Sequence, residues 1–376
     1  MGVISGPVRL LHTTALLVLL CAWALPCRAN LLLLHSDSAG SPAAACVLQG
    51  MQQALDAHGV HTDILQYHLG ADRNDSEEHF DDMAEALARL LKEHPIQGVT
   101  CDGDAALAVL QRYRASLFGT IPATFCNVDH FEPRMGRDGN CTGLTTEPGV
   151  APLLETMLAL HPEARTVVVF TDHTPESYEI RHAAQEVFSR HMDRMQLVLP
   201  GFEAGREAGL DKKQVVRIAR NMPADGLVLL ARLTRDGNGS FIDQPELART
   251  MAASCPVPVY VLHEADMAAG TAGGYVTNEK EQGRMAAQAL LALMQGHSLS
   301  EFPVTSLPRQ WRFHKAPLQK AGADLAALPP NALVDGKQQQ TATTWFPLPP
   351  GMAALGGVLI GLLAVLLMRK RPRNRQ

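Results

Sequence analysis

The sequence has no excess of basic residues, and this absence limits the partners that the protein can bind. Its 376 residues include 33 Lys and Arg against 38 Asp and Glu, for a formal net charge of −5. Domains that bind nucleic acid through its phosphates normally carry a clear basic surplus. We therefore expect no nucleic-acid partner.

Motifs for catalysis and for metal binding are also missing. The chain contains no C-x-x-C, no H-E-x-x-H and no G-x-S-x-G, the patterns typical of cysteine metal or redox sites, zinc proteases and α/β-hydrolases. We predict no catalytic residue, no metal site and no cofactor, and hence no enzyme. One enzymatic alternative stays open, an exported α/β hydrolase whose Ser, His and Asp converge from distant segments.

Long apolar runs are confined to the two ends of the chain. Residues 352–368 (MAALGGVLIGLLAVLLM) carry no charge, and RKRPRNRQ follows them. A run of about 17 apolar residues can span a bilayer as a helix, and a basic flank stays on the cytoplasmic side. We predict a transmembrane helix over residues 351–368 and a cytoplasmic basic tail over 369–376.

The N-terminus has the three parts of a secretion signal. Arg9 supplies the positive charge, and residues 15–25 (ALLVLLCAWAL) form a short apolar segment. Cys27 and Ala29 are small residues at positions −3 and −1 before Asn30. We predict a signal peptide over residues 1–29, with an uncleaved second anchor or a lipoprotein at Cys27 as alternatives. The protein should then sit in the inner membrane as a single-pass protein, with its globular region in the periplasm or outside the cell.

Cysteines are few and widely spaced. Five remain after the predicted cleavage, and an odd number leaves at least one thiol free in an oxidising compartment. A Cys126–Cys141 disulfide is one alternative, and buried free thiols are the favoured one. The five are Cys46, Cys101, Cys126, Cys141 and Cys255.

Between the two ends, apolar runs of strand length alternate with amphipathic helical patterns. This alternation is typical of parallel sheets with helices on both faces, and the pattern occurs twice, which indicates two α/β lobes. Strands are expected at residues 31–35, 60–67, 98–102, 121–128, 165–172, 195–199, 226–233 and 257–263, and helices at 42–57, 76–93, 105–113, 150–160, 175–191, 211–221, 244–253 and 279–294.

The lobes are expected to exchange segments. We assign residues 30–147 and 276–315 to lobe 1 and residues 148–275 to lobe 2, and the segment QWRFH at 310–314 is a candidate for a third crossing strand. Residues 316–350 are rich in Pro, Ala and Gln, which is typical of a stiff or disordered tether.

Polar residues follow nearly every expected strand. In open parallel sheets, ligands bind beyond the carboxyl ends of the strands, so these residues as a set predict a ligand site. Helix capping or loop solvation is the alternative for each single residue. The candidates are Ser36, Asp37, Asp102, Asn127 and Asp129 from the first lobe, and Asp172, Arg232 and His263 from the second.

Several segments together resemble a known family. LLLLHSDSAGSP, GVTCDGDAALAVLQRYRASLFGTIPATFCNVDHF, GNCTGLTTEPG and AAGTAGGYVTNEKEQGRMAAQALLALMQG follow one another in the order found in the ABC transporter substrate-binding protein family, as seen in periplasmic sensor domains. The resemblance covers about residues 31–330. It implies the two-lobed type 1 periplasmic-binding fold, to which the apolar run at the C-terminus adds the predicted membrane helix.

The resemblance also implies a function. A small organic ligand would bind between the lobes, for transport with an ABC permease or for sensing with a separate membrane sensor kinase. Arg232 is the expected partner of a ligand carboxylate or phosphate. The first loop, at residues 36–41, departs from the aromatic residues that relatives often carry there. A ligand-free remnant or interaction module of a sensor kinase is therefore the main alternative.

Overall fold

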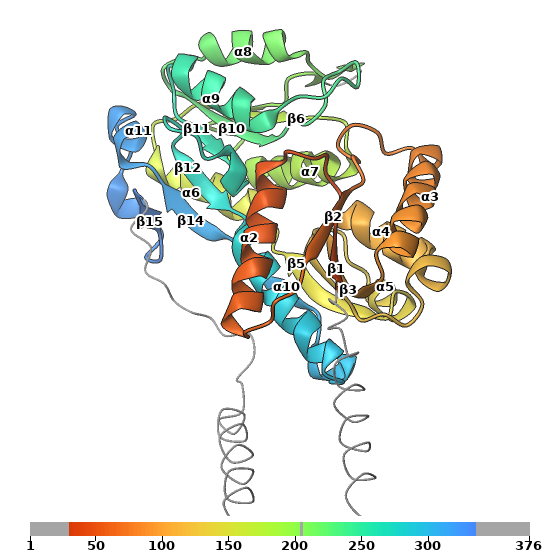
Figure 1. Ribbon diagram of the computed structural model, residues 1–376. Coiled ribbons are helices and arrows are strands. Elements are labelled where there is room, and N and C mark those ends of the chain that lie inside the picture. The colour runs from red at the N-terminus through yellow and green to blue at the C-terminus, as the bar shows by residue number, and fades with distance from the viewer. Residues whose placement is uncertain (1–29, 204–205, 336–376) are drawn as a thin grey trace, which may run out of the picture. The chain divides into compact units, whose positions relative to one another are not determined.

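The chain forms two large sheets with helices on both faces (Figure 1). The computed structural model describes residues 30–203 and 206–335, and these residues lie in one compact unit. The predicted signal peptide, residues 336–350 of the tether, the helix at 351–368 and the basic tail lie outside the described residues. Within the described ranges, no helix is both long and apolar enough to cross a membrane.

The first sheet has six strands, all parallel, in the order β13-β5-β4-β3-β1-β2. The four leucines at 31–34 are each at most 1% exposed, because helices cover both faces of a parallel sheet. Leu32 and Leu34 pack on one face and Leu31 on the other. The strands are β1 (Asn30–His35), β2 (Ile64–His68), β3 (Ile96–Asp102), β4 (Ala123–Val128), β5 (Cys141–Thr146) and β13 (Thr305–Leu307).

The second sheet has seven strands in the order β15-β14-β12-β11-β10-β6-β7, and only the β12–β14 pair is antiparallel. Val167 and Val169 enter one core cluster and Val168 the other, on opposite faces. The strands are β6 (Thr166–Thr171), β7 (Gln196–Val198), β10 (Gly226–Arg232), β11 (Val259–Val261), β12 (Gly273–Val276), β14 (Gln310–Phe313) and β15 (Leu333–Val334), and a separate hairpin holds β8 (Phe202–Glu203) and β9 (Arg206–Glu207).

Helices α2 and α10 lie side by side against the first sheet (Figure 1). They approach closely because glycines face the partner backbone: a Cβ on Gly50 would lie 1.9 Å from Lys280 O, and one on Gly283 would lie 2.2 Å from Val47 O. The α-helices are α2 (Pro42–Ala57), α3 (Glu77–Glu93), α4 (Asp104–Arg112), α5 (Pro133–Asp138), α6 (Val150–Leu160), α7 (Pro175–Ser189), α8 (Lys212–Arg220), α9 (Gln244–Ser254), α10 (Glu279–Met294) and α11 (Lys315–Lys320), with short turns η1 (Arg114–Phe118), η2 (Glu264–Asp266), η3 (Leu299–Glu301) and η4 (Leu325–Ala327).

The chain passes between the two sheets three times, and one arginine links the three crossings. The crossings follow β5, β12 and β13, at residues 147–149, 277–278 and 308–309. Arg309 is 8% exposed and donates hydrogen bonds to Glu147 O (2.7 Å) and to Leu262 O (2.6 Å). Leu262 O also accepts from the Thr277 amide (3.2 Å). Arg309 therefore ties the three crossings together through the carbonyl groups of Glu147 and Leu262, of which the bond to Leu262 O is buried.

Two predictions about the C-terminal part of the globule are wrong. Residues 310–315 do not belong to the first lobe, because β14 pairs with β12 in the second sheet. The tether does not begin at residue 316, because Leu318 is fully buried in the core of the second sheet and β15 extends that sheet beside β14. The predicted division at residues 147 and 275 stays a prediction, since all described residues belong to one compact unit.

The five cysteines of the described region are all free. Cys126 and Cys141 are buried, on the neighbouring strands β4 and β5, and they form no disulfide. The expectation of buried free thiols is therefore confirmed for this pair, and the alternative Cys126–Cys141 bridge is wrong.

We predict that Arg309→Met destabilises the protein by about 2–4 kcal/mol, because the buried carbonyl group of Leu262 and the partly buried one of Glu147 lose their charged donor. Urea-induced unfolding of the protein measures the change. Arg217→Met, which removes an exposed arginine from α8, is the matched control and should change stability by less than about 0.5 kcal/mol. Equal effects of the two substitutions would contradict the role given to Arg309.

Candidate functional site

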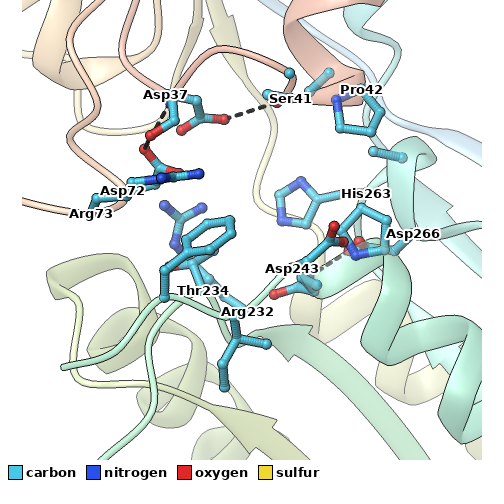
Figure 2. Close-up of a pocket in the computed structure, with 18 of the residues that line it drawn as sticks. Asp37, Ser41, Pro42, Asp72, Arg73, Arg232, Thr234, Asp243, His263 and Asp266 are labelled. Atoms are coloured by element: carbon cyan, nitrogen blue, oxygen red, sulfur yellow. Dashed lines mark hydrogen bonds between the residues drawn. The ribbon is translucent and has the colours of Figure 1, made fainter. Parts of the chain in front are cut away.

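The candidate site lies at the carboxyl ends of strands from both sheets. Two adjoining hollows of about 270 Å³ each are lined by loops that follow β1, β2, β3, β4, β6, β10 and β11. Figure 2 shows Asp37 and Asp72 on one side, across from Arg232 and Thr234 on the other. The residues that line both hollows are Asp37, Ala43, Asp72, Arg232, Thr234, His263 and Glu279.

Asp102, at the end of β3, is held in place through both of its carboxylate oxygens. Its Oδ2 lies 2.7 Å from Nδ1 of His35, which is fully buried and stacks on His68 with ring centroids 4.5 Å apart. Its Oδ1 accepts from Asn127 Nδ2 at 2.7 Å. The carboxylate lines the second hollow in a fixed orientation.

Asn127 stands at a break in the ladder between β4 and β5. The register shifts between Phe125 and Val128, and Asn127 has a φ of 52°. Asparagine tolerates this left-handed backbone better than most residues, and such conformations cluster at functional sites. The Asn127 amide donates to Gln282 Oε1 (3.1 Å), while its own Oδ1 is buried without a partner.

Ser36 and Asp37 follow β1, and the structure gives them different roles. The Ser36 hydroxyl donates to Asp102 O (2.8 Å) and accepts from the Ala106 amide (3.0 Å), so it fastens the start of α4. The Asp37 carboxylate accepts from the Ser41 hydroxyl at 3.3 Å and lines both hollows. Burial raises the pKa of Asp37, and Arg232 opposes this shift.

Asp172 lies behind the hollows and does not line them. It is 1% exposed, and its Oδ1 accepts from the hydroxyls of Thr174 and Ser177, both at 2.6 Å. Its Oδ2 accepts from the Thr234 amide and hydroxyl at 2.9 and 3.0 Å. Burial opposes ionisation, but these hydrogen bonds from Ser177 and Thr174 hold the pKa of Asp172 below its usual value. Asp172 therefore joins the loops after β6 and β10.

Arg232 is already paired within its own half of the protein. Its Nη1 lies 2.7 Å from Oε2 of Glu176, on the first turn of α7. Its Nε is buried without a partner. Arg232 therefore attracts an anionic ligand less strongly than the sequence alone suggested, since the adjacent Glu176 carboxylate compensates its positive charge.

His263 and Asp129 complete the set of predicted site residues. His263, after β11, lines both hollows, and its Nε2 is buried without a partner. Burial, with Arg309 and Arg232 nearby, lowers the pKa of His263 well below its ordinary value, so the ring is neutral. Asp129 is exposed at the edge of the second hollow. Seven of the eight predicted residues thus line the hollows, and Asp172 alone does not.

Contacts between the two halves cross the mouth of the site. Arg235, in the loop after β10, donates to Asp72 O (2.9 Å) and to Ala71 O, and it pairs with Asp75 at 3.1 Å. Arg73 lies over the ring of Phe241, 4.7 Å from its centroid. We call Arg235, Arg73 and Phe241 the latch.

The sequence interpretation missed the residues that lie outside strand ends. Glu279 opens α10, Glu176 lies on α7, and Asp266 ends the short η2 turn. Glu176 and Glu279 stand where acids commonly stand in the first turn of a helix, where they interact favourably with the helix dipole. The only available signal was the position of Glu279 directly after an expected crossing of the chain.

Comparison with known proteins shows the fold. No family model and no curated protein matches this chain. A conserved domain protein from Vibrio cholerae O1 biovar El Tor matches with a TM-score of 0.57 and 15% identity over 82% of this chain and 99% of that one. The ABC domain from Streptococcus pneumonia in complex with L-Trp matches with 0.54 and 14%, over 81% and 99%.

A third solved structure is a ligand-free, open substrate-binding protein with adhesive properties from Clostridium difficile. Its TM-score is 0.53 at 16% identity, over 81% of this chain and 98% of that one. The predicted two-lobed type 1 periplasmic-binding fold is therefore confirmed for the described residues. At this level of identity, the structural similarity shows the fold and does not identify a ligand.

Asp266 gives the site a pH-dependent contribution to stability. Burial raises the pKa of Asp266 to about 7, against a hydrogen bond from Gln244 that lowers it. The folded protein thus holds this proton more tightly than the unfolded chain. The stabilisation is complete below about pH 4, the unfolded pKa, and is lost as the pH rises towards 7.

We predict that Asp266→Asn removes this loss of stability, because the amide stays neutral. Between pH 4 and pH 8, the variant should gain roughly 2–4 kcal/mol relative to the original protein. Urea-induced unfolding at several pH values measures the difference. The control Asp56→Asn changes an exposed acid on α2 and should leave the profile unaltered; an Asp266→Asn profile parallel to the original would refute the assignment.

Proposed function

We propose that this protein, which has the type 1 periplasmic-binding fold, is an extracytoplasmic solute-binding protein that captures a small organic molecule between its two sheets. One observation carries the proposal. Four residues that line the two hollows each hold a buried polar atom without a hydrogen-bond partner, and buried polar groups in folded proteins are normally satisfied. The atoms are Asn127 Oδ1, Arg232 Nε, His263 Nε2 and Glu279 Oε2.

A bound solute would satisfy these atoms from both halves at once. Asn127 belongs to the first sheet, Arg232 and His263 follow strands of the second, and Glu279 follows a crossing. A ligand favours closure only by binding the closed form more tightly than the open one. Groups contributed by both halves supply that difference, and the latch adds contacts that exist only when the halves meet.

We propose a location and partners for the protein from its sequence. The apolar run at 352–368 with its basic flank supports a single membrane anchor, and the N-terminal signal supports export. The binding region would then work in the periplasm or outside the cell. It would hand its solute to an ABC permease or report it to a separate membrane sensor kinase.

The arrangement around the hollows does not favour a hydrolase. In the described ranges, no serine hydroxyl hydrogen-bonds a histidine ring, and the Ser36 hydroxyl is used between Asp102 O and the Ala106 amide. His35 pairs with Asp102 but is fully buried. A nucleophile and base within hydrogen-bond reach are what such catalysis requires.

We predict that a thermal-shift screen of the purified protein against amino acids, amines, sugars, nucleobases and small carboxylates finds a stabilising solute. At about 100 times its Kd, a solute should stabilise the protein by roughly 2.7 kcal/mol, a shift of several degrees. A well-folded protein that responds to none of these classes would overturn the proposed function and favour a ligand-free interaction module.

We predict that Arg235→Ala opens the two halves, because the hydrogen bonds from its guanidinium to the loop at 71–75 are lost. Small-angle X-ray scattering should show a larger radius of gyration than that of the original protein. The control Arg217→Ala removes an exposed arginine of α8 and should leave the radius unchanged. An unchanged radius in Arg235→Ala would remove the latch from the mechanism.

A further inference from the structure

The lining of the two hollows carries far more acidic than basic side chains. Three arginines face ten carboxyl groups, from loops of both sheets. The arginines are Arg73, Arg232 and Arg235, and the acids are Asp37, Asp72, Asp75, Asp102, Asp104, Asp129, Glu176, Asp243, Asp266 and Glu279. A cleft in which carboxyl groups outnumber arginines in this way favours solutes of positive charge.

Each of the three arginines is already engaged. Arg232 pairs with Glu176, and Arg235 bonds to backbone carbonyls and to Asp75. Arg73 lies on the ring of Phe241. An anionic solute would therefore meet compensated cations and an excess of carboxylates.

Glu279 is an acid of this lining with one carboxylate oxygen that lacks a hydrogen-bond partner. It is 4% exposed and lines both hollows. Its Oε1 accepts from the Thr277 hydroxyl, while its Oε2 is buried with no hydrogen-bond partner. The N-terminus of α10 favours a negative charge at this first position of the helix. A buried carboxylate oxygen in this state is an acceptor that awaits a donor.

The neighbours of Glu279 strengthen the case for a cationic donor. Asn127 Oδ1, a second acceptor without a partner, belongs to the residue whose amide bonds Gln282, one turn along α10. Burial raises the pKa of Glu279, with the charge of Asp102 adding to the shift and that of Arg309 opposing it. A positive group placed here would relieve both the repulsion and the unpaired oxygen.

We propose, on the basis of the proposed function above, that the solute is a small organic cation whose ammonium group binds Glu279 in the cleft. An ammonium group has three donors and no acceptor, which matches the two unpartnered oxygens of Glu279 and Asn127. Phe241 is the single Phe, Tyr or Trp side chain lining the two hollows. The cleft therefore selects its solute by charge and hydrogen bonding, with little aromatic stacking.

The test uses four solutes with four-carbon chains and different charges. Putrescine carries two ammonium groups, γ-aminobutyrate one ammonium and one carboxylate, 1,4-butanediol no charge, and succinate two carboxylates. Binding to the full-length protein is measured by calorimetry and thermal shift, beside the broad solute screen. We expect putrescine to bind most tightly and succinate to show no binding.

Two substitutions connect binding to the proposed group. Glu279→Gln should weaken putrescine binding about tenfold or more, because a hydrogen bond to a charged partner is lost. Asp37→Asn removes a second carboxyl group that lines both hollows and should also weaken putrescine binding, because the lining then attracts a cation less strongly. Glu85→Gln removes the same charge from an exposed site on α3 and should leave affinity unchanged. Circular dichroism confirms that each variant is folded.

Each outcome decides between the two proposals. Putrescine binding that Glu279→Gln weakens and Glu85→Gln leaves intact supports the cation site. Binding of succinate, 1,4-butanediol or another non-cationic solute in preference to amines would overturn the cation site and leave the solute-binding function standing. Equal affinity in the original protein and Glu279→Gln would overturn the assignment to Glu279. A folded protein that binds no solute would overturn both proposals.

Discussion

The hydrogen bonds of Arg309 at the chain crossings are the constraint on which the rest of the structure depends. A chain that passes three times between two sheets must bury backbone carbonyl groups at the passage, and these need donors. Arg309 supplies them to Glu147 O and Leu262 O with a single fixed guanidinium. Gly149 makes space for the Arg309 side chain, because a Cβ at this position would lie 2.6 Å from Arg309 Cδ. Arg309 therefore helps to fix the relative position of the two sheets at the chain crossings, and the latch joins them at the mouth of the site.

The site follows from that arrangement. Once the carboxyl ends of both sets of strands meet, loops that end in polar groups are brought together and partly desolvated. Hydrogen bonds inside each half then fix the walls: His35 and Asn127 hold Asp102, and Asp172 joins the loops after β6 and β10. Some polar atoms of the site keep no hydrogen-bond partner, above all Glu279 Oε2. These atoms are the groups that we propose a solute binds.

Sequence patterns predicted most parallel strands of the two sheets, missed the parallel strands β5 and β12, and predicted the C-terminal additions poorly. The apolar run at 31–34 is a strand buried on both faces, as its composition indicates. In contrast, β14 and the segment up to β15 were assigned to the wrong lobe and to a tether. Leu318 and the short β15 lack a periodic pattern of their own. Their positions depend on the second sheet, because Leu318 packs into its core and β15 pairs with β14 at its edge.

The sequence by itself determined the class of fold and seven of the eight candidate residues that line the hollows, because strand ends in parallel sheets face one common edge. Only the tertiary structure decided which charges remain available. Arg232 forms an ion pair with Glu176, which compensates its charge. The two residues are far apart in the sequence, so no sequence motif predicts this contact. Glu279 gains its importance from burial beside a chain crossing, since an acid at a helix start is ordinary until solvent is removed from it.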